Sequence, residues 1–242
     1  MKEVKKEVYG TRNSWLKPML ESNNINFFSD LWVATCRSKI NNDNLSRYAV
    51  LLESKSDKNV KENIKENVPV YFIRILKNNQ VYLENLRNNK SKTLSYKEFI
   101  RGFTSKLGCK HISSFAKGST NASSLSVFFR EYMGKGFALT DVDFYFGASN
   151  IMIEEKGFVK GGEYCYLGIG QCISFREIIK DIFNNPKFYL VSKQEKKFYM
   201  SELIKLNCFN SEEIKGWGEM NPIKVYETSR KGIINKLLSH NN

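Results

Sequence analysis

Long apolar runs are absent from this sequence of 242 residues. No stretch of about 18 apolar residues occurs, so no transmembrane span is expected. The first ten residues, MKEVKKEVYG, are charged and contain no apolar stretch of the kind that marks a secretory signal. The hydrophobic fraction of 41% is enough to bury the core of one large domain or two small ones. We therefore expect a soluble, intracellular protein of the cytoplasm.

Residues that commonly bind zinc are scarce. The sequence has two histidines and no C-x-x-C pair, which argues against a structural zinc site. The number of cysteines is odd, and we expect free, mostly buried thiols of a reducing compartment. These cysteines are Cys36, Cys109, Cys165, Cys172 and Cys208. A P-loop and a GxGxxG motif followed by a helix are also missing, which argues against nucleotide binding.

Positive charge, in contrast, is abundant. The 38 basic and 25 acidic residues give a net charge of +13. Such an excess attracts polyanions, of which nucleic acid is the commonest. A chain rich in Lys and Asn can also be basic through compositional bias alone. Charge by itself therefore leaves nucleic-acid binding open.

Residues 1–116 predict an α+β region rich in antiparallel strands. Apolar and β-branched runs predict strands at 31–36, 47–53, 68–76 and 81–86. An Asn-rich turn joins the last two as a hairpin, and the charged segment 54–67 predicts an exposed loop. Ser95 and Glu98 form a capping box that begins a helix ending near residue 103. No catalytic motif occurs in this region, which we assign to substrate positioning or dimerisation.

Residues 117–242 predict a second region that begins with a stretch of small polar residues. A helix follows, ended by Gly134, and then strands at 137–146 and 150–156. A second amphipathic helix covers 168–183, and a further strand covers 187–192. This order of helix, strand, strand, helix and strand predicts a mixed sheet flanked by helices.

Two strands of this second region carry charged residues on one face. Side chains alternate between the faces of a strand, so Asp141 and Asp143 share a face, as do Glu154 and Lys156. Glu155 points the other way. If the two strands pair as a hairpin, two carboxylates and one ammonium group converge at the edge of an apolar sheet.

A divalent cation suits such a cluster. Carboxylates among apolar neighbours are partly desolvated and repel one another. Magnesium prefers oxygen ligands and keeps several waters, so that one or two carboxylates suffice to bind it. The bound ion polarises a phosphoryl oxygen and lowers the pKa of a coordinated water. Lys156 is then suited to orient that water or to offset the charge on the phosphorane.

The pattern D-x10-E-x-K, from Asp143 to Lys156, resembles the motif of the PD-(D/E)xK nuclease superfamily. That superfamily includes restriction endonucleases, RecB-type nucleases and Holliday-junction resolvases. The resemblance covers residues 120–192 and implies a restriction-endonuclease-like core within 117–242. It also allows for a homodimer, because many members cut duplexes as dimers. One departure is that Val142 stands where the superfamily pattern has proline.

Two further residues match features of the superfamily. Glu131 lies on the helix before the motif, where members often have an additional metal-binding acid. Gln171 follows the E-x-K strand, where RecB-like members have a glutamine that orders the site. Alternatives remain open for both, since Glu131 also suits a solvated helix face. Ser174 and Glu177 form a competing capping box that would begin the second helix after Gln171.

The sequence therefore predicts a Mg²⁺- or Mn²⁺-dependent nuclease that favours DNA over RNA. Asp143 and Glu154 are the predicted metal ligands, with Asp141 and Glu131 as further candidates, and Asp143 has the commoner spacing. Lys156 and Gln171 complete the predicted catalytic set. Two alternatives remain: an inactive nucleic-acid-binding or assembly protein with the same fold, and an RNA endonuclease of the same chemistry.

Overall fold

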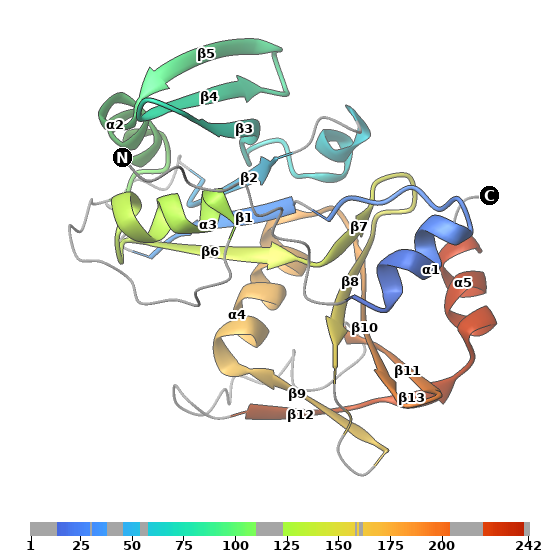
Figure 1. The fold of residues 1–242 in the computed structure, drawn as a ribbon. Helices are drawn as coiled ribbons and strands as arrows, with labels where there is room; N and C mark the ends of the chain where they lie inside the picture. Colours follow the sequence, from blue (N-terminus) through green and yellow to red (C-terminus); the bar gives the residue numbers. More distant parts are fainter. Residues whose placement is uncertain are drawn as a thin grey trace.

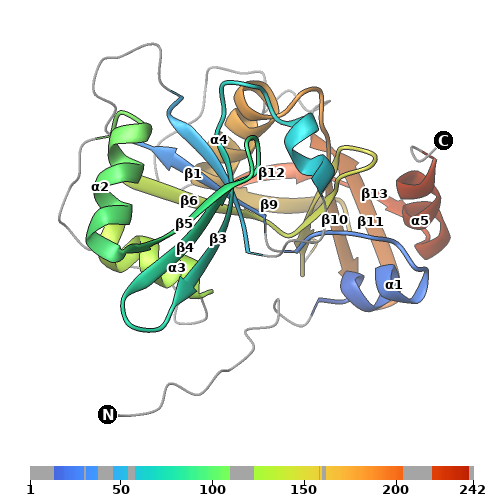
Figure 2. The ribbon, with the colours of Figure 1, turned by 90° about the horizontal axis from the view of Figure 1, so that it is seen from above.

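The computed structural model describes residues 14–29, 31–37, 46–53, 58–109, 123–157, 159, 162–203 and 220–239. Within these residues the chain is an α+β protein with two large sheets and one two-stranded sheet (Figure 1). Seen from above, α2 (Tyr96–Lys106) and α5 (Arg230–Leu238) lie at opposite ends of the molecule (Figure 2). The predicted class, mixed sheets flanked by helices, is confirmed.

The first large sheet has the strand order β5-β4-β3-β2-β1-β6. Its strands are β1 (Leu31–Cys36), β2 (Tyr48–Leu52), β3 (Val70–Leu76), β4 (Gln80–Asn85), β5 (Lys90–Ser95) and β6 (Phe137–Val142). All neighbours are antiparallel except β2 and β3. The predicted hairpin of β3 and β4 is confirmed, and its turn uses Asn78 and Asn79 with φ angles of 64° and 58°, which asparagine tolerates well.

The second large sheet has the order β13-β11-β10-β8-β7. Its strands are β7 (Phe144–Phe146), β8 (Ile151–Lys156), β10 (Lys187–Gln194), β11 (Lys197–Glu202) and β13 (Tyr226–Thr228). The sheet is mixed, because β8 and β10 run parallel whereas β7 and β8 form an antiparallel hairpin. The two-stranded sheet pairs β9 (Tyr164–Gly168) with β12 (Met220–Lys224).

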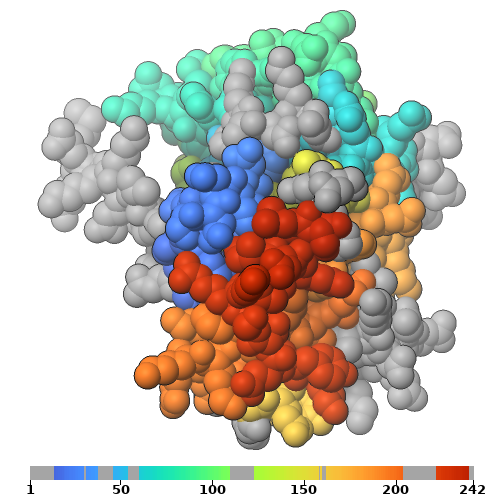
Figure 3. Space-filling view, turned by 90° about the vertical axis from the view of Figure 1, so that its right-hand side faces the viewer, coloured from blue at the N-terminus to red at the C-terminus, as the bar shows by residue number. Residues whose placement is uncertain are grey.

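Helices separate and cover the two large sheets. The outer face of the first sheet packs against α2, α3 (Ser124–Phe128) and the π-helical turn η2 (Phe129–Met133). Its inner face shares a core with α4 (Ile169–Glu177), the π-helical turn η3 (Ile178–Ile182) and the second sheet. The far face of the second sheet is covered by α1 (Leu16–Ser22) and α5, which lie side by side in Figure 3.

The segment predicted as one strand at 137–146 is two strands. β6 pairs with β1 in the first sheet, and β7 pairs with β8 in the second. The chain passes from one sheet to the other at Asp143, which belongs to neither strand. Alternation of side chains indicates only that each half is extended, and it does not reveal that the halves have different partners.

The predicted boundary near residue 117 lies outside the described residues, and the two predicted regions exchange elements. β6 comes from the second region but completes the first sheet. α1 comes from the first region but packs on the second sheet, where Leu16 and Leu20 are fully buried. Each predicted region therefore contributes a helix or strand that packs with the other region.

The prediction of an exposed loop at 54–67 is wrong for its described part. Residues Lys58–Asn63 form the 3-10 helix η1, and Val60 and Ile64 are 0% and 2% exposed in the central core. The high charge of this segment concealed Val60 and Ile64, the two apolar residues that it contributes to the central core.

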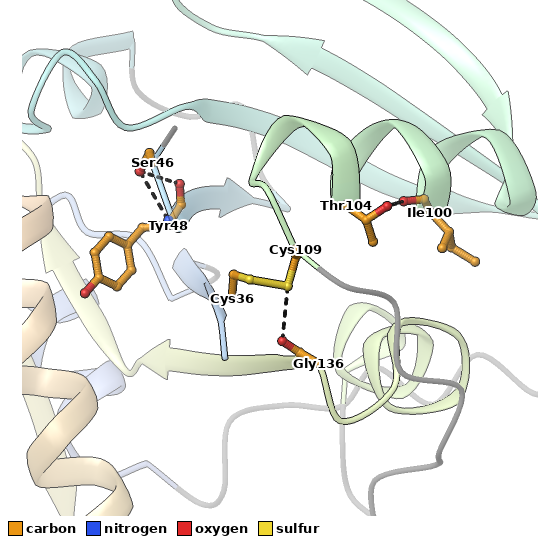
Figure 4. The surroundings of a disulfide bond; sticks show 7 residues. All are labelled: Cys36, Ser46, Tyr48, Ile100, Thr104, Cys109 and Gly136. Carbon is orange, nitrogen blue, oxygen red and sulfur yellow. Dashed lines mark hydrogen bonds between the residues drawn. A yellow bond between two sulfur atoms is a disulfide. The ribbon is translucent and has the colours of Figure 1, made fainter. Parts of the chain in front are cut away.

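The prediction of free thiols is wrong for two cysteines. Cys36, at the end of β1, forms a disulfide with Cys109, which follows α2 (Figure 4). The Cys109 sulfur also lies 3.3 Å from the carbonyl oxygen of Gly136, just before β6. Cys165 and Cys172 are buried thiols, as predicted, and Cys208 lies outside the described residues.

Among the described helices, none has the length and apolar character needed to cross a membrane.

Arg87, two residues after β4, binds the segment that follows η1. Its guanidinium donates hydrogen bonds to the backbone carbonyl oxygens of Ile64 (3.1 Å), Lys65 (2.6 Å) and Val68 (3.0 Å). Replacing Arg87 with alanine leaves these carbonyls without their donor, and we expect the free energy of unfolding to fall by about 2–3 kcal/mol. Urea denaturation measures this change. Arg101→Ala on the exposed face of α2 is the matched control, and an equal loss in that variant would contradict the account.

Candidate active site

The β7–β8 hairpin brings Asp143 and Glu154 together. Phe144, the residue after Asp143, pairs with Ile153, the residue before Glu154. The two carboxyl groups lie close enough for the charge of Asp143 to act on Glu154. The backbone N–H of Glu155 donates a 2.7 Å hydrogen bond to Oδ2 of Asp143 and fixes that carboxylate at the sheet edge. The predicted convergence of these two carboxylates is confirmed.

Glu154, Lys156 and Gln171 form one hydrogen-bonded cluster. Lys156 Nζ lies 2.6 Å from Oε1 of Glu154, and Gln171 Nε2 donates to the same oxygen at 3.0 Å. Lys156 Nζ also donates to Oε1 of Gln171 at 3.2 Å. Each side chain thus contacts the other two, which restricts all three to one arrangement.

Gln171 reaches this cluster because α4 begins early. The helix starts at Ile169 with Gly168 as its N-cap, so Gln171 lies in the first turn. The competing capping box of Ser174 and Glu177 does not begin the helix, since both residues lie within α4. This settles the alternative left open by the sequence in favour of the early start.

Glu154 is an unusual carboxylate in electrostatic terms. Only 4% of the residue is exposed, and it directly follows the apolar residues Ile151–Ile153 of β8. Burial, followed by repulsion from Asp143, raises the pKa of Glu154 to about 8, despite the opposing effect of Lys156. An acid with such a pKa ionises near neutral pH, which is uncommon outside functional sites.

Asp143 is perturbed in the same direction. Burial is the largest cause that raises the pKa of its carboxyl, and the negative charge of Asp141 adds to it. The hydrogen bond from the Glu155 backbone and the charge of Lys156 act in the opposite sense. Both carboxyl groups therefore resist ionisation. A cation bound between them would stabilise their ionised forms.

The opposite face of β8 has a structural role. Glu155 points away from the cluster, as predicted, and accepts a hydrogen bond from Ser14 Oγ and a 3.0 Å bond from the backbone N–H of Trp15. These contacts attach the start of α1 to the second sheet. Nothing in the sequence around Ser14 indicates this partner, because the contact spans about 140 residues.

A further residue was missed by the sequence analysis. Ser192 on β10 is fully buried, and its Oγ donates a 2.7 Å hydrogen bond to the carbonyl oxygen of Lys156. β10 runs parallel to β8, with Ser192 opposite Lys156. Ser192 therefore fixes the end of the strand that carries Lys156. The signal was a polar residue at the end of the apolar run 187–192.

Asp141 and Glu131 differ from the central pair. Asp141 lies on β6 and is exposed, and its charge reaches Asp143 and Glu154. Asp143 is therefore the better candidate for the main ligand. Glu131 lies exposed on η2, where its charge acts on Tyr96 of α2. Its role as a metal ligand stays a prediction.

The donor set fits a hard divalent cation that keeps most of its water. Among the described residues, no group of three or more His, Cys, Asp or Glu side chains is arranged to hold a metal ion. Two buried, mutually repelling carboxylates are nevertheless sufficient for Mg²⁺, which commonly uses one or two.

No protein-family model, no curated protein and no solved structure matches this chain. The resemblance to the PD-(D/E)xK superfamily therefore stays an expectation based on the motif and its local arrangement.

Proposed function

We propose that this chain is a nuclease that requires Mg²⁺ or Mn²⁺ and hydrolyses phosphodiester bonds, with DNA as its substrate. The observation that carries the proposal is the buried Glu154, which interacts with Asp143 and is hydrogen-bonded to both Lys156 and Gln171. A buried carboxylate pair beside an ammonium group has little structural reason to persist unless a cation and an anionic substrate use it. The net charge of +13 agrees with a polyanionic substrate.

Each residue of the cluster has its own role in the proposed reaction. Asp143 and Glu154 would hold the divalent ion, which polarises a phosphoryl oxygen and lowers the pKa of a bound water. Lys156, anchored on Glu154, supplies a positive charge that orients the attacking water and offsets charge on the phosphorane. Gln171 holds Glu154 and Lys156 at a fixed separation. Because these side chains are oriented before substrate binds, they do not need to rearrange during the reaction.

Removal of the metal tests the proposal. Supercoiled plasmid incubated with the protein and Mg²⁺ is expected to be nicked, because the ion supplies the charge that the carboxylate pair lacks. Excess EDTA is expected to stop nicking, and added Mn²⁺ to restore it. Agarose electrophoresis of the plasmid forms measures the result. Nicking that continues unchanged in EDTA would contradict the proposal.

Parallel substrates separate this function from its alternatives. Single-stranded RNA and duplex DNA are assayed under the same conditions. Cleavage of RNA alone would retain the chemistry but make DNA the wrong substrate. Binding of either nucleic acid without any cleavage would instead identify an inactive binding protein.

A further inference from the structure

Almost half of the net positive charge of the chain lies at one end of the first sheet. Residues 70–107, which contain β3, β4, β5 and α2, have eight basic and two acidic residues, a net charge of +6 in a chain of +13. Arg87 donates its hydrogen bonds to the segment after η1. The other seven basic residues are all exposed: Arg74, Lys77, Lys90, Lys92, Lys97, Arg101 and Lys106. This end of the molecule therefore presents concentrated positive charge to the solvent.

β5 and α2 form one continuous surface. Leu94 of β5 packs against the same hydrophobic cluster as Phe99 of α2. Because side chains alternate along a strand, Lys90 and Lys92 lie on the same face of β5 as Leu94, which is the face toward α2. The charge of Lys92 acts on Glu98 in the first turn of α2, in agreement with this placement.

The exposed face of α2 carries positive charge that is not neutralised. Lys97 and Arg101 are one helical turn apart and lie on the side opposite the buried residues of the helix. Within the described part of the chain, no carboxylate forms an ion pair with Lys90, Lys97 or Arg101. Glu98 is the one acidic residue of α2, and its carboxylate accepts hydrogen bonds from the backbone and the side chain of Ser95.

This surface borders the candidate active site through η2. The ring of Tyr132 on η2 lies 4.9 Å from the ring of Tyr96 at the start of α2. η2 also borders a hollow of about 350 Å³ that Asp141 and Gln171 line, and Gln171 is hydrogen-bonded to Glu154. Figures 1 and 2 both show α2 beside α3, the helix that continues into η2. A nucleic acid held at the acidic cluster can therefore extend across η2 to α2.

We propose that Lys90, Lys97 and Arg101 bind the phosphate backbone of the substrate DNA beyond the cleavage position. The inference rests on the proposed function and deepens it by naming the surface that positions the substrate. Contacts with phosphates supply affinity and orientation, but they do not read the base sequence. DNA fits this surface better than an anionic membrane does, because the apolar side of α2 is buried in the core, whereas a helix that lies on lipid needs an exposed apolar face.

Paired variants test the surface by equilibrium binding, without cleavage. Fluorescence anisotropy in EDTA measures the affinity for a labelled duplex of about 30 base pairs at several salt concentrations. Lys97→Ala with Arg101→Ala is expected to weaken binding by roughly 10-fold and to reduce the slope of log K against log salt by about 1.8, because each phosphate contact contributes about 0.9. Adding Lys90→Ala should reduce the slope by about 0.9 more.

The matched control removes the same charge from the opposite end of the molecule. Lys231 and Lys236 are exposed on α5, which lies far from α2 in Figure 2. Their alanine pair is expected to change the affinity less than about 2-fold, because charges that do not contact the DNA are screened by salt. An equal loss in both pairs would reduce the effect to general charge and overturn the inference.

Charge reversal gives a larger effect and guards against misfolding. Lys97→Glu with Arg101→Glu is expected to weaken binding by at least ~100-fold, because the phosphates are then repelled. Position 97 lies in the first turn of α2, where an acidic side chain suits the helix dipole, so we expect an unchanged circular dichroism spectrum. Unchanged affinity in the folded glutamate pair would contradict the inference.

Two further outcomes separate this inference from its rivals. Cosedimentation with phosphatidylserine vesicles that depends on Lys97 and Arg101, together with DNA binding that does not, would overturn it in favour of a membrane surface. Absence of plasmid nicking, with DNA affinity still lost in the α2 variants, would reject the proposed function and leave this surface standing. Nicking by the wild type, with equal affinity in all variants, would reject the surface and leave the function.

Discussion

Replacing Glu154 with glutamine is expected to lower metal-dependent cleavage by at least roughly 10²–10³-fold and, at the same time, to stabilise the metal-free protein at pH 8. Cleavage falls because the neutral amide is a poor ligand for a hard cation. Stability rises because the wild-type fold must otherwise hold a buried, ionised carboxylate beside Asp143. A change that improves the fold and removes the activity is typical of a functional residue.

The pH dependence follows from the raised pKa of Glu154. In the unfolded chain the carboxyl ionises near its ordinary pKa of 4.5, and in the fold near 8. The stability contributed by the protonated form is complete below pH 4.5 and is lost as the pH rises to about 8. The total loss is on the order of 4 kcal/mol. The stability of metal-free wild type is therefore expected to fall across this interval, and that of Glu154→Gln to lack this component.

Urea denaturation at pH 5 and pH 8, in EDTA, measures the stability difference, and plasmid nicking in Mg²⁺ measures the activity. Lys156→Met is a second test of the cluster, because it removes the ammonium group but keeps the aliphatic stem, and it should also lose cleavage. For cleavage, Glu155→Gln is the matched control on the same strand, since its side chain points to the opposite face. Wild-type cleavage by Glu154→Gln would show that the activity comes from another site or a contaminant.

Loss of the Cys36–Cys109 disulfide is expected to lower the free energy of unfolding by about 4 kcal/mol. The bridge spans 73 residues of sequence, and a closed loop of that length restricts the unfolded chain strongly. Urea denaturation of the oxidised wild type and of Cys36→Ser with Cys109→Ser, without reductant, measures the effect.

Cys172→Ala serves as its control, because it removes a buried thiol that is not part of the bridge. Thiol titration of the denatured, unreduced protein should find no more than three of the five cysteines reactive. Five reactive thiols, together with equal stability of wild type and the double variant, would contradict the presence of the bridge.

The parts of the site that the sequence predicted are those fixed by local pattern. Alternation along 151–156 set Glu154 and Lys156 on one face, and the short turn at 147–149 indicated the hairpin. The helical spacing after residue 168 put Gln171 at the start of a helix. These features depend on residues close together in the chain, where period and turn chemistry are sufficient.

The features that the sequence did not predict depend on long-range partners. The strand is interrupted at Asp143 because β6 pairs with β1, about 100 residues earlier, whereas β7 pairs with β8. The pairing of β9 with β12, the disulfide and the attachment of Ser14 to Glu155 are contacts of the same kind. A single sequence does not indicate which distant segments contact each other, because these contacts depend on the packing of the whole core.

The central claim is that Asp143 and Glu154 share one divalent ion. Crystals soaked in Mn²⁺, with diffraction collected near the manganese absorption edge, test it most directly. The account predicts an anomalous peak between the two carboxylates, with oxygen ligands at about 2.0–2.2 Å, and its disappearance in Glu154→Gln crystals. A soaked crystal with no peak at this position, or a peak that persists in the variant, would contradict the account.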